Sequence, residues 1–256
     1  MPTSKSSGTR PRSIARAKRG RGKGQLPLTG VPASPEPIET PARPERKRRY
    51  IVVDGPIGVG KTTLAQVLAR ELGGRLVLED SDSNPFLARF YEDSEKYAFP
   101  AQLYFLLTRY NQQRELAQQD LFAQVTVADY LFAKDRIFAS LNLTPDELKL
   151  YDGVHRLLDA EMAKPDFVVY VRAQVEVLAE RLRKRNRHFE RDISYAYLER
   201  VAGAYRDFFF YYEEAPLLVV DTSEIDFVAN SEDLAALIRE IKNAGDGVQH
   251  FVPRKS

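Results

Sequence analysis

The sequence predicts an α/β protein with three layers, in which a five-stranded parallel sheet is flanked by helices. From Tyr50 onward, short apolar runs rich in β-branched residues alternate with longer stretches of helical pattern. Units that alternate at these lengths imply parallel strands joined by helical crossovers. The chain has 256 residues, which is enough for one such domain with a sizeable buried core.

The expected elements follow from these runs and from their end signals. Helix 62–72 ends at Gly73 and Gly74, residues that often close a helix. Another helix begins at Thr144, which suits an N-cap, and Pro145, which suits the first helical position. Strands are expected at 50–54, 75–78, 124–129, 166–171 and 217–221, and helices at 62–72, 85–91, 97–119, 145–163, 175–184, 194–212 and 231–243.

Composition divides the chain into a basic tail at 1–48, one folded domain at 49–246 and a short C-terminal tail at 247–256. Residues 1–49 hold 13 Lys and Arg but 3 Asp and Glu, so the remaining chain, with 25 basic and 33 acidic residues, is mildly acidic. The first segment is rich in Pro, Gly, Ser and Arg without apolar periodicity, which predicts disorder. A solvated extension is the simplest interpretation; contact with a polyanion such as nucleic acid and a transit peptide are the alternatives.

Two features that the sequence lacks exclude certain kinds of site and of protein. The chain has no cysteine, which excludes disulfides, zinc–thiolate sites and cysteine nucleophiles and fits a reducing cytoplasm. No run approaches the ~20 apolar residues that span a bilayer, so no membrane contact is expected.

A phosphate-binding loop matching G-x-x-x-x-G-K-[ST] lies directly between the first strand and the first helix. Its glycines let backbone N–H groups turn inward, and the helix N-terminus adds partial positive charge. Lys61 is expected to reach the β- and γ-phosphates of ATP, and Thr62 to bind the accompanying Mg²⁺. The ATP-binding candidates here are Gly55, Pro56, Ile57, Gly58, Val59, Gly60, Lys61, Thr62 and the adjoining Thr63.

The rest of the sequence favours a P-loop kinase over a GTPase. An N-K-x-D guanine signature is absent, and Asp129 is not followed by the glycine of a D-x-x-G switch. A kinase instead needs a base near the acceptor and arginines over the phosphates.

Glu79 is the candidate for that base. It follows the second strand, and ligands of open α/β sheets lie outside the carboxyl ends of the strands. A carboxylate there can accept the proton of an attacking hydroxyl, although a solvated loop acid would look the same in sequence.

Gln102 and Arg109 are seven residues apart on a largely apolar helix, so they share a face. Buried donors without partners are costly, which means that both side chains must find hydrogen bonds. Either they recognise the edge of a flat heterocycle, or they make structural hydrogen bonds within the protein.

Four stretches, in this order and spacing, resemble a deoxynucleoside kinase: GPIGVGKTT, NPFLARFYED, YAFPAQLYFLLTR and DYLFAKDRIFASL. The chain is most similar to the bacterial deoxyadenosine/deoxyguanosine kinase branch, over roughly residues 49–243. The resemblance implies a homodimeric enzyme of nucleotide salvage that uses Mg²⁺ and ATP to phosphorylate the 5′-hydroxyl of a deoxynucleoside. Purine deoxynucleosides are expected first and deoxycytidine second, because a carboxylate beside the base accepts hydrogen bonds from exocyclic amino groups.

The resemblance also assigns roles to individual residues. Around the acceptor, it implies Glu79 as general base, Tyr91 at the sugar 3′-hydroxyl, Gln102 at the base edge, Arg109 and Asp135 as a pair beside the base, and Phe138 stacked on the base. Around the phosphates, it implies Asp129 near Mg²⁺ together with Thr62, Arg185 and Arg187 as lid arginines that stabilise charge, Glu190 near the sugar, and Arg181, Asp226 and Phe227 bordering ATP.

The sequence departs from the family pattern at two positions, and the first of them affects the phosphate contacts. The family commonly reads Asp/Glu-Arg-Ser after the third strand, whereas this chain reads Asp129-Tyr130-Leu131. The arginine that would approach the 5′-oxygen is therefore missing from that position, and Arg136 is the candidate to replace it. Asp80 also follows Glu79 where many members have proline.

Two other functions stay open. A nucleoside-monophosphate kinase of the thymidylate type would need arginines aimed at an acceptor phosphate, whereas this chain offers Glu79, Asp80 and Asp82. The second alternative, of another class, is a nucleic-acid-associated nucleotide sensor that acts through its basic tail.

Overall fold

The computed structural model describes residues 50–119, 125–185 and 193–253. The strands are β1 (Tyr50–Asp54), β2 (Arg75–Val77), β3 (Thr126–Ala128), β4 (Phe167–Arg172), β5 (Leu217–Asp221) and β6 (Val248–Phe251). The helices are α1 (Lys61–Glu71), α2 (Leu87–Glu92), α3 (Ser94–Gln119), the 3₁₀ helix η1 (Phe132–Lys134), α4 (Asp135–Asn142), α5 (Pro145–Asp159), α6 (Val175–Arg185), α7 (Tyr195–Phe210) and α8 (Ser231–Asn243).

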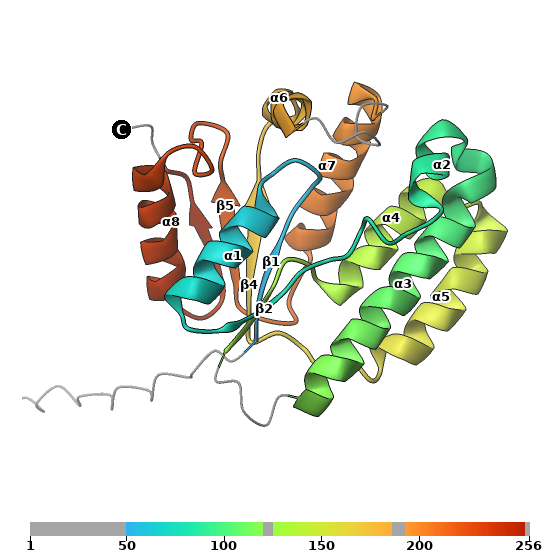
Figure 1. Ribbon diagram of the computed structural model, residues 1–256, viewed down its shortest axis with the longest axis horizontal. Helices are drawn as coiled ribbons and strands as arrows, with labels where there is room; N and C mark the ends of the chain where they lie inside the picture. Colours follow the sequence, from blue (N-terminus) through green and yellow to red (C-terminus); the bar gives the residue numbers. More distant parts are fainter. Residues whose placement is uncertain (1–49, 120–124, 186–192, 254–256) are drawn as a thin grey trace, which may run out of the picture. The chain divides into compact units, whose positions relative to one another are not determined.

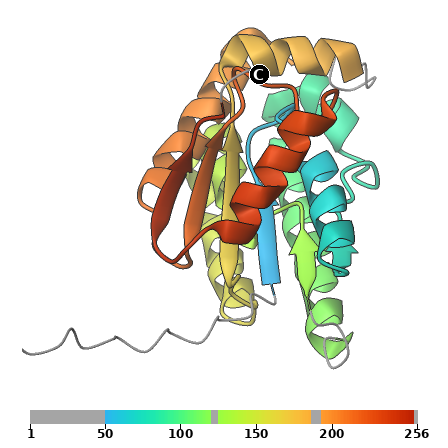
Figure 2. The same ribbon diagram turned by 90° about the vertical axis from the view of Figure 1, so that its left-hand side faces the viewer.

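All strands are parallel and run in the order β2-β3-β1-β4-β5-β6. The central strand β1 pairs with β3 on one side and with β4 on the other (Figure 2, blue strand between the green and the yellow one). Parallel strands end at the same edge of a sheet, and ligands of open α/β sheets lie there. The segments that follow β1, β3 and β2 therefore meet at one end of the molecule.

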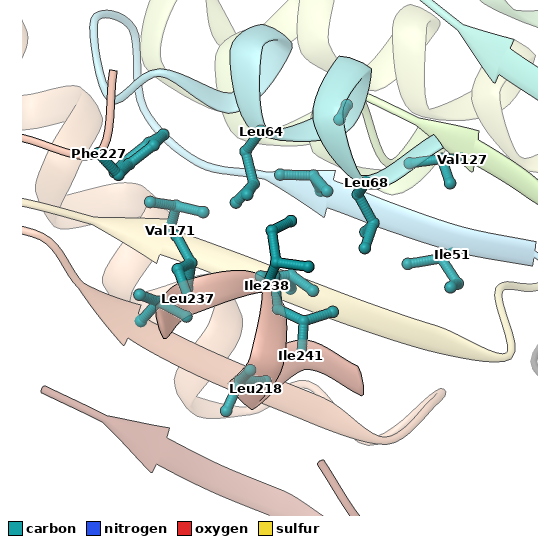
Figure 3. Packing of buried hydrophobic residues seen from close by; sticks show 14 of the residues in the cluster. Ile51, Leu64, Leu68, Val127, Val171, Leu218, Phe227, Leu237, Ile238 and Ile241 are labelled. Carbon is teal, nitrogen blue, oxygen red and sulfur yellow. The ribbon is translucent and has the colours of Figure 1, made fainter. Parts of the chain in front are cut away.

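Helices cover both faces of this sheet, which confirms the three-layer prediction. Side chains of a strand alternate between the faces: Ile51 and Val53 pack with α1 and α8, whereas Val52 packs with α4 and α7. Figure 3 shows the first of these cores, with leucines and isoleucines of both helices over the strands. In Figure 2, which looks at that face, α1 and α8 lie in front of the sheet.

Helices α2, α3 and α5 form further layers of packing next to α4. Leu106 of α3 and Tyr151 of α5 pack with Phe132 of η1 and Ala139 of α4. The short helix α2 packs against the N-terminal half of α3 through Leu87 and Phe90. Figure 1 shows α3 and α5 side by side on the outside of α4. No helix among the described residues is long and apolar enough to cross a membrane.

The sheet has six strands rather than the five predicted. The additional strand β6 lies within the segment predicted as a C-terminal tail and pairs with β5 from Leu217–Val248 to Val220–Phe251. This edge strand has no buried residue, and Val248 is exposed, so it lacks the buried apolar run by which the other strands were predicted. Helix α4 was also not predicted, since it is a single short segment that follows directly on η1.

The helix start predicted at Thr144 is confirmed. Thr144 forms a capping box with Glu147, in which each residue accepts a hydrogen bond from the backbone N–H of the other. This cap fixes the N-terminus of α5.

Candidate active site

The phosphate-binding loop between β1 and α1 has a backbone that only glycine fits. Gly58 and Gly60 have φ angles of 84° and 96°, in the left-handed region where side chains are strained. A Cβ atom on Gly60 would lie 2.8 Å from the ring of Phe227, and one on Gly58 would lie 2.9 Å from Leu182 of α6. The loop is therefore packed closely between α6 and the segment after β5.

Gly55 is required because the backbone of β4 lies too close for a side chain, and this steric explanation can be tested. A Cβ atom at this position would lie 2.1 Å from the carbonyl oxygen of Val171. We expect Gly55→Ala to lower the free energy of unfolding, measured by urea denaturation, by about 1–3 kcal/mol. The control is Gly153→Ala in α5, where nothing lies within 4 Å and the substitution should be neutral or stabilising. Equal effects of both substitutions would contradict the steric explanation.

One buried carboxylate joins this loop to the segment after β3. Asp54 Oδ1 accepts hydrogen bonds from the backbone N–H of Gly55 at 2.7 Å and from the hydroxyl of Tyr205 at 3.2 Å. Its Oδ2 accepts from the backbone N–H of Leu131 at 2.8 Å. Asp54 thus connects the phosphate-binding loop, the turn after β3 and helix α7.

A cavity of about 320 Å³ lies at the carboxyl edge of the sheet. This volume falls in the range of small-molecule sites, which is ~300–1,000 Å³. Its walls come from the phosphate-binding loop, the segment after β2, α2, α3, η1 and α4. It collects these predicted site residues: Ile57, Gly58, Lys61, Thr62, Glu79, Tyr91, Gln102, Arg109, Asp129, Phe138 and Arg185.

Asp129 ties three of these segments together. Its Oδ2 accepts a hydrogen bond from Thr62 Oγ1 at 2.6 Å, and its Oδ1 accepts from the backbone N–H of Glu79 at 2.7 Å. Oxygen ligands of this kind suit Mg²⁺, which is usually held by one or two protein groups together with substrate phosphates and water. Among the described residues, no group of three or more His, Cys, Asp or Glu could hold a metal. Thr62 Oγ1 and Asp129 Oδ2, which lie 2.6 Å apart beside the phosphate-binding loop, offer the two protein oxygens that this mode of binding needs.

Glu79 is held by two buried cations. Its Oε1 accepts a hydrogen bond from Arg109, and its Oε2 lies 2.8 Å from the Lys134 ammonium. Arg109 also forms an ion pair with Asp135. The expected base and the expected Arg–Asp pair therefore belong to one network. Asp135 is fully buried and does not line the cavity, so it reaches the cavity only through Arg109.

Positive charge accumulates where a polyphosphate would lie. Burial, with a contribution from the neighbouring Lys134, lowers the pKa of Lys61 to about 8. Burial also lowers the pKa of Lys134 to about 8, opposed by the nearby carboxylates of Asp54 and Asp129. A bound anion would favour the charged form of both amines.

The other end of the cavity combines an amide with aromatic rings. Gln102 and Arg109 are both buried and both line the cavity, which confirms that they share one face of α3. The guanidinium of Arg109 lies 4.8 Å from the centre of the Phe105 ring. Phe138, Tyr91 and Tyr197 complete this end. Flat apolar surfaces with a few polar groups are typical of sites for a heterocycle.

Comparison with known proteins adds a decisive observation to this geometry. The sequence model of the family "Deoxynucleoside kinase" matches residues 51–244, which is well over half of the chain. The chain belongs to the deoxynucleoside kinase family. This kinase is therefore a phosphotransferase, and its P-loop fold agrees with the prediction from sequence.

Relatives of the kinase include two curated bacterial proteins. The deoxyguanosine kinase of Bacillus subtilis (strain 168) is 34% identical over 198 residues, 75% of this chain and 96% of the relative. The deoxyadenosine kinase of Lactobacillus acidophilus is 30% identical over 207 residues, 75% and 94% of the two chains. A solved structure of deoxyadenosine kinase from M. mycoides with bound dATP has the same fold, with a TM-score of 0.65 and 24% identity, and covers 75% of this chain and 98% of its own.

The segment that was predicted to form a lid lies only in part within the described residues. Arg185, exposed at the end of α6, lines the cavity, while Arg187 and Glu190 lie outside the described residues. Arg181 does not line the cavity; it donates hydrogen bonds to the carbonyl oxygens of Ile225 at 2.7 Å and Thr222 at 3.0 Å. It thereby joins α6 to the segment after β5.

Two residues of that segment were expected to border ATP, and their roles stay predictions. Asp226 Oδ1 accepts from the backbone N–H of Val228 at 3.2 Å, and Phe227 is fully buried against the phosphate-binding loop. Neither lines the cavity, and the same holds for Gly55, Pro56, Val59, Gly60 and Thr63 of the loop.

Lys134 was not among the predicted site residues, and the structure places Arg136, the candidate to replace the missing arginine, outside the cavity. Arg136 is exposed and pairs with Asp152 at 2.9 Å, away from the cavity, because it lies on the outer side of α4. Tyr130, which occupies the arginine position, is buried in the core. Lys134 instead lines the cavity. Its only signal in the sequence was its place directly after the apolar run Leu131-Phe132-Ala133.

Proposed function

We propose that this kinase transfers the γ-phosphoryl group of ATP to the 5′-hydroxyl of a purine deoxynucleoside, as a step of nucleotide salvage. One observation carries the proposal: the phosphate-binding Lys61 and Thr62, the carboxylate of Glu79 and the heterocycle-binding pair Gln102 and Arg109 line the same cavity. Relatives that are named for deoxyguanosine and deoxyadenosine support the purine preference.

In the proposed reaction, Glu79 accepts the proton of the 5′-hydroxyl. The 5′-oxygen forms a bond to the γ-phosphorus, and the bond from that phosphorus to the bridging oxygen breaks, which leaves ADP. Lys61, Arg185 and Arg187 would stabilise the negative charge on the transferring group. Mg²⁺ bound to Thr62 and Asp129 would supply further positive charge at the phosphates.

For the acceptor, Gln102 offers one donor and one acceptor to the base edge. Asp135 fixes the guanidinium of Arg109 rather than meeting the base directly, since it lies behind the cavity wall. We keep deoxycytidine as the second substrate. Phe138 would stack on the base, and Tyr91 would contact the sugar 3′-hydroxyl together with Glu190.

The proposal is tested by ADP release with Mg-ATP against deoxyguanosine, deoxyadenosine, deoxycytidine, thymidine and dTMP. We expect the highest kcat/KM for a purine deoxynucleoside and no turnover of dTMP, because Asp80 and Asp82 in the cavity wall repel a monophosphate. Turnover of dTMP alone would mean a monophosphate kinase. Thymidine as the best substrate would overturn the assignment of the base-binding residues.

Three further parts of the proposal concern the whole chain. A homodimer is supported by Leu150 and Leu157, which are exposed two turns apart on α5 and offer an apolar contact. Use of ATP and the absence of cysteine support action in the cytoplasm. The basic tail 1–48, which lies outside the described residues, is proposed as a solvated extension, with nucleic-acid contact as its alternative.

A further inference from the structure

Lys134 is a buried lysine whose charged group lies in the candidate active site. Its side chain is 2% exposed, and its ammonium lies 2.8 Å from Glu79 Oε2. It ends the 3₁₀ helix η1 and lines the cavity together with Lys61 and Asp129. The residue therefore stands within the site and contacts the group that is proposed to accept the hydroxyl proton.

Burial of this amine is costly. A lysine taken out of water loses its hydration, and only a well-placed carboxylate offsets that loss. Phe132 and Ile137 of the same segment are buried apolar side chains, so the Lys134 ammonium lies at the edge of an apolar core. The ion pair with Glu79 offsets the cost of burying this charge. We therefore look for the role of Lys134 in its effect on Glu79.

The two cations on Glu79 are not equivalent. Arg109 is shared between Glu79 and Asp135, whereas Lys134 forms its ion pair with Glu79 alone within the described part of the chain. The last torsion of a glutamate is broad, so a carboxylate bound through one oxygen can still rotate. Arg109 binds one oxygen and Lys134 the other, which fixes the carboxylate plane.

Enough acceptor capacity remains for the substrate. An ionised carboxylate has about four lone-pair sites, and the two cations use one on each oxygen. Glu79 can therefore still receive the hydrogen bond of an acceptor hydroxyl while both cations hold it.

We propose that Lys134 is a positioning residue of phosphoryl transfer, which orients the Glu79 carboxylate toward the acceptor hydroxyl. The proposal rests on the proposed function, because it takes Glu79 as the base. The cation beside the base would then be Lys134 of η1, five residues after Asp129. The residue directly after Asp129, where the family commonly has arginine, is the buried Tyr130.

The test is a double-mutant cycle in steady-state kinetics with deoxyguanosine and Mg-ATP. Lys134→Met keeps an unbranched side chain of similar volume and removes the terminal ammonium; we expect kcat to fall about 10²-fold from misplacement of the base, with both KM values within about threefold of wild type. Lys134→Arg, which keeps charge and donors, should recover part of the lost kcat. In a Glu79→Gln background, Lys134→Met should cause less than about a threefold further loss, because it acts through Glu79.

Controls separate positioning from other roles. Arg136→Met, two residues away and outside the cavity, should keep wild-type kinetics, and thermal unfolding should show that every variant is folded. Unchanged kcat in Lys134→Met, losses that multiply in the double variant, or a rise confined to the KM for Mg-ATP would each overturn the proposal. If Lys134→Met fails to fold, Lys134→Gln, which also removes the charge, takes its place in the same cycle with the same expected outcomes.

The cycle also distinguishes this proposal from the proposed function. If the wild-type kinase turns over deoxyguanosine and the two losses multiply, the positioning role is wrong and the function stands. If the wild type turns over no deoxynucleoside, the proposed function is wrong, and the role of Lys134 falls with it.

Discussion

Replacement of Glu79 by glutamine should lower kcat for a deoxynucleoside by about 10²–10⁴-fold, the usual contribution of a general base. Glutamine has nearly the same shape but cannot accept the hydroxyl proton. Binding should change much less, since Gln102 and the aromatic wall remain in place. Steady-state ADP release measures kcat and the KM of both substrates.

The variant needs two checks, because the substitution also removes an ion-pair partner from Arg109 and Lys134. Thermal unfolding and Mg-ATP affinity show whether the protein is still folded and binds its nucleotide. Glu92→Gln is the matched control: Glu92 is exposed at the end of α2 and outside the cavity, so kcat should not change. A Glu79→Gln enzyme with nearly full kcat would mean that another group accepts the proton.

Replacement of Lys61 by methionine is expected to cost about 10²–10³-fold in kcat, the magnitude found when one preorganised charge-stabilising group is removed. Methionine fills a similar volume, so the loop should keep its backbone. The KM for ATP should rise as well, because the lysine also attracts the phosphates before the transition state.

The corresponding control is Lys149→Met, which removes an exposed lysine of α5 that lies outside this cavity. Its kcat and KM values should equal those of the wild type. Lys61→Met with normal kcat and a raised KM alone would show that Lys61 binds ATP without stabilising the transferring group.

Much of the fold could be predicted because each crossover unit carries its own local signals. An apolar strand and a closing glycine pair were sufficient to find β1 and α1, an N-cap located the start of α5, and helix α8 was predicted with the limits that the structure shows. Strand β6 could not be predicted, because an exposed edge strand lacks the apolar pattern of a buried one. Its pairing depends on β5 and on the chain path through Gly247, whose φ is 81°.

The sequence could predict which candidate residues lie together where they follow a strand or share a helix face. Asp129, Glu79 and the phosphate-binding loop meet because β3, β2 and β1 are neighbours, and Gln102 and Arg109 meet because of helical spacing. Tertiary packing decided the remainder. The short elements η1 and α4 turn Lys134 inward and Arg136 outward, although the two residues are separated only by Asp135.

Asp54 has a consequence for how the two substrates affect each other. Its carboxylate holds the backbone of Gly55 on the nucleotide side and of Leu131 at the start of the turn that leads to Lys134. Neither backbone segment can shift without straining the bond to the other. Thermodynamic linkage makes such coupling reciprocal: whatever change ATP causes in nucleoside affinity, the nucleoside must cause in ATP affinity. Cooperativity between donor and acceptor can thus pass through a single side chain at the end of the central strand.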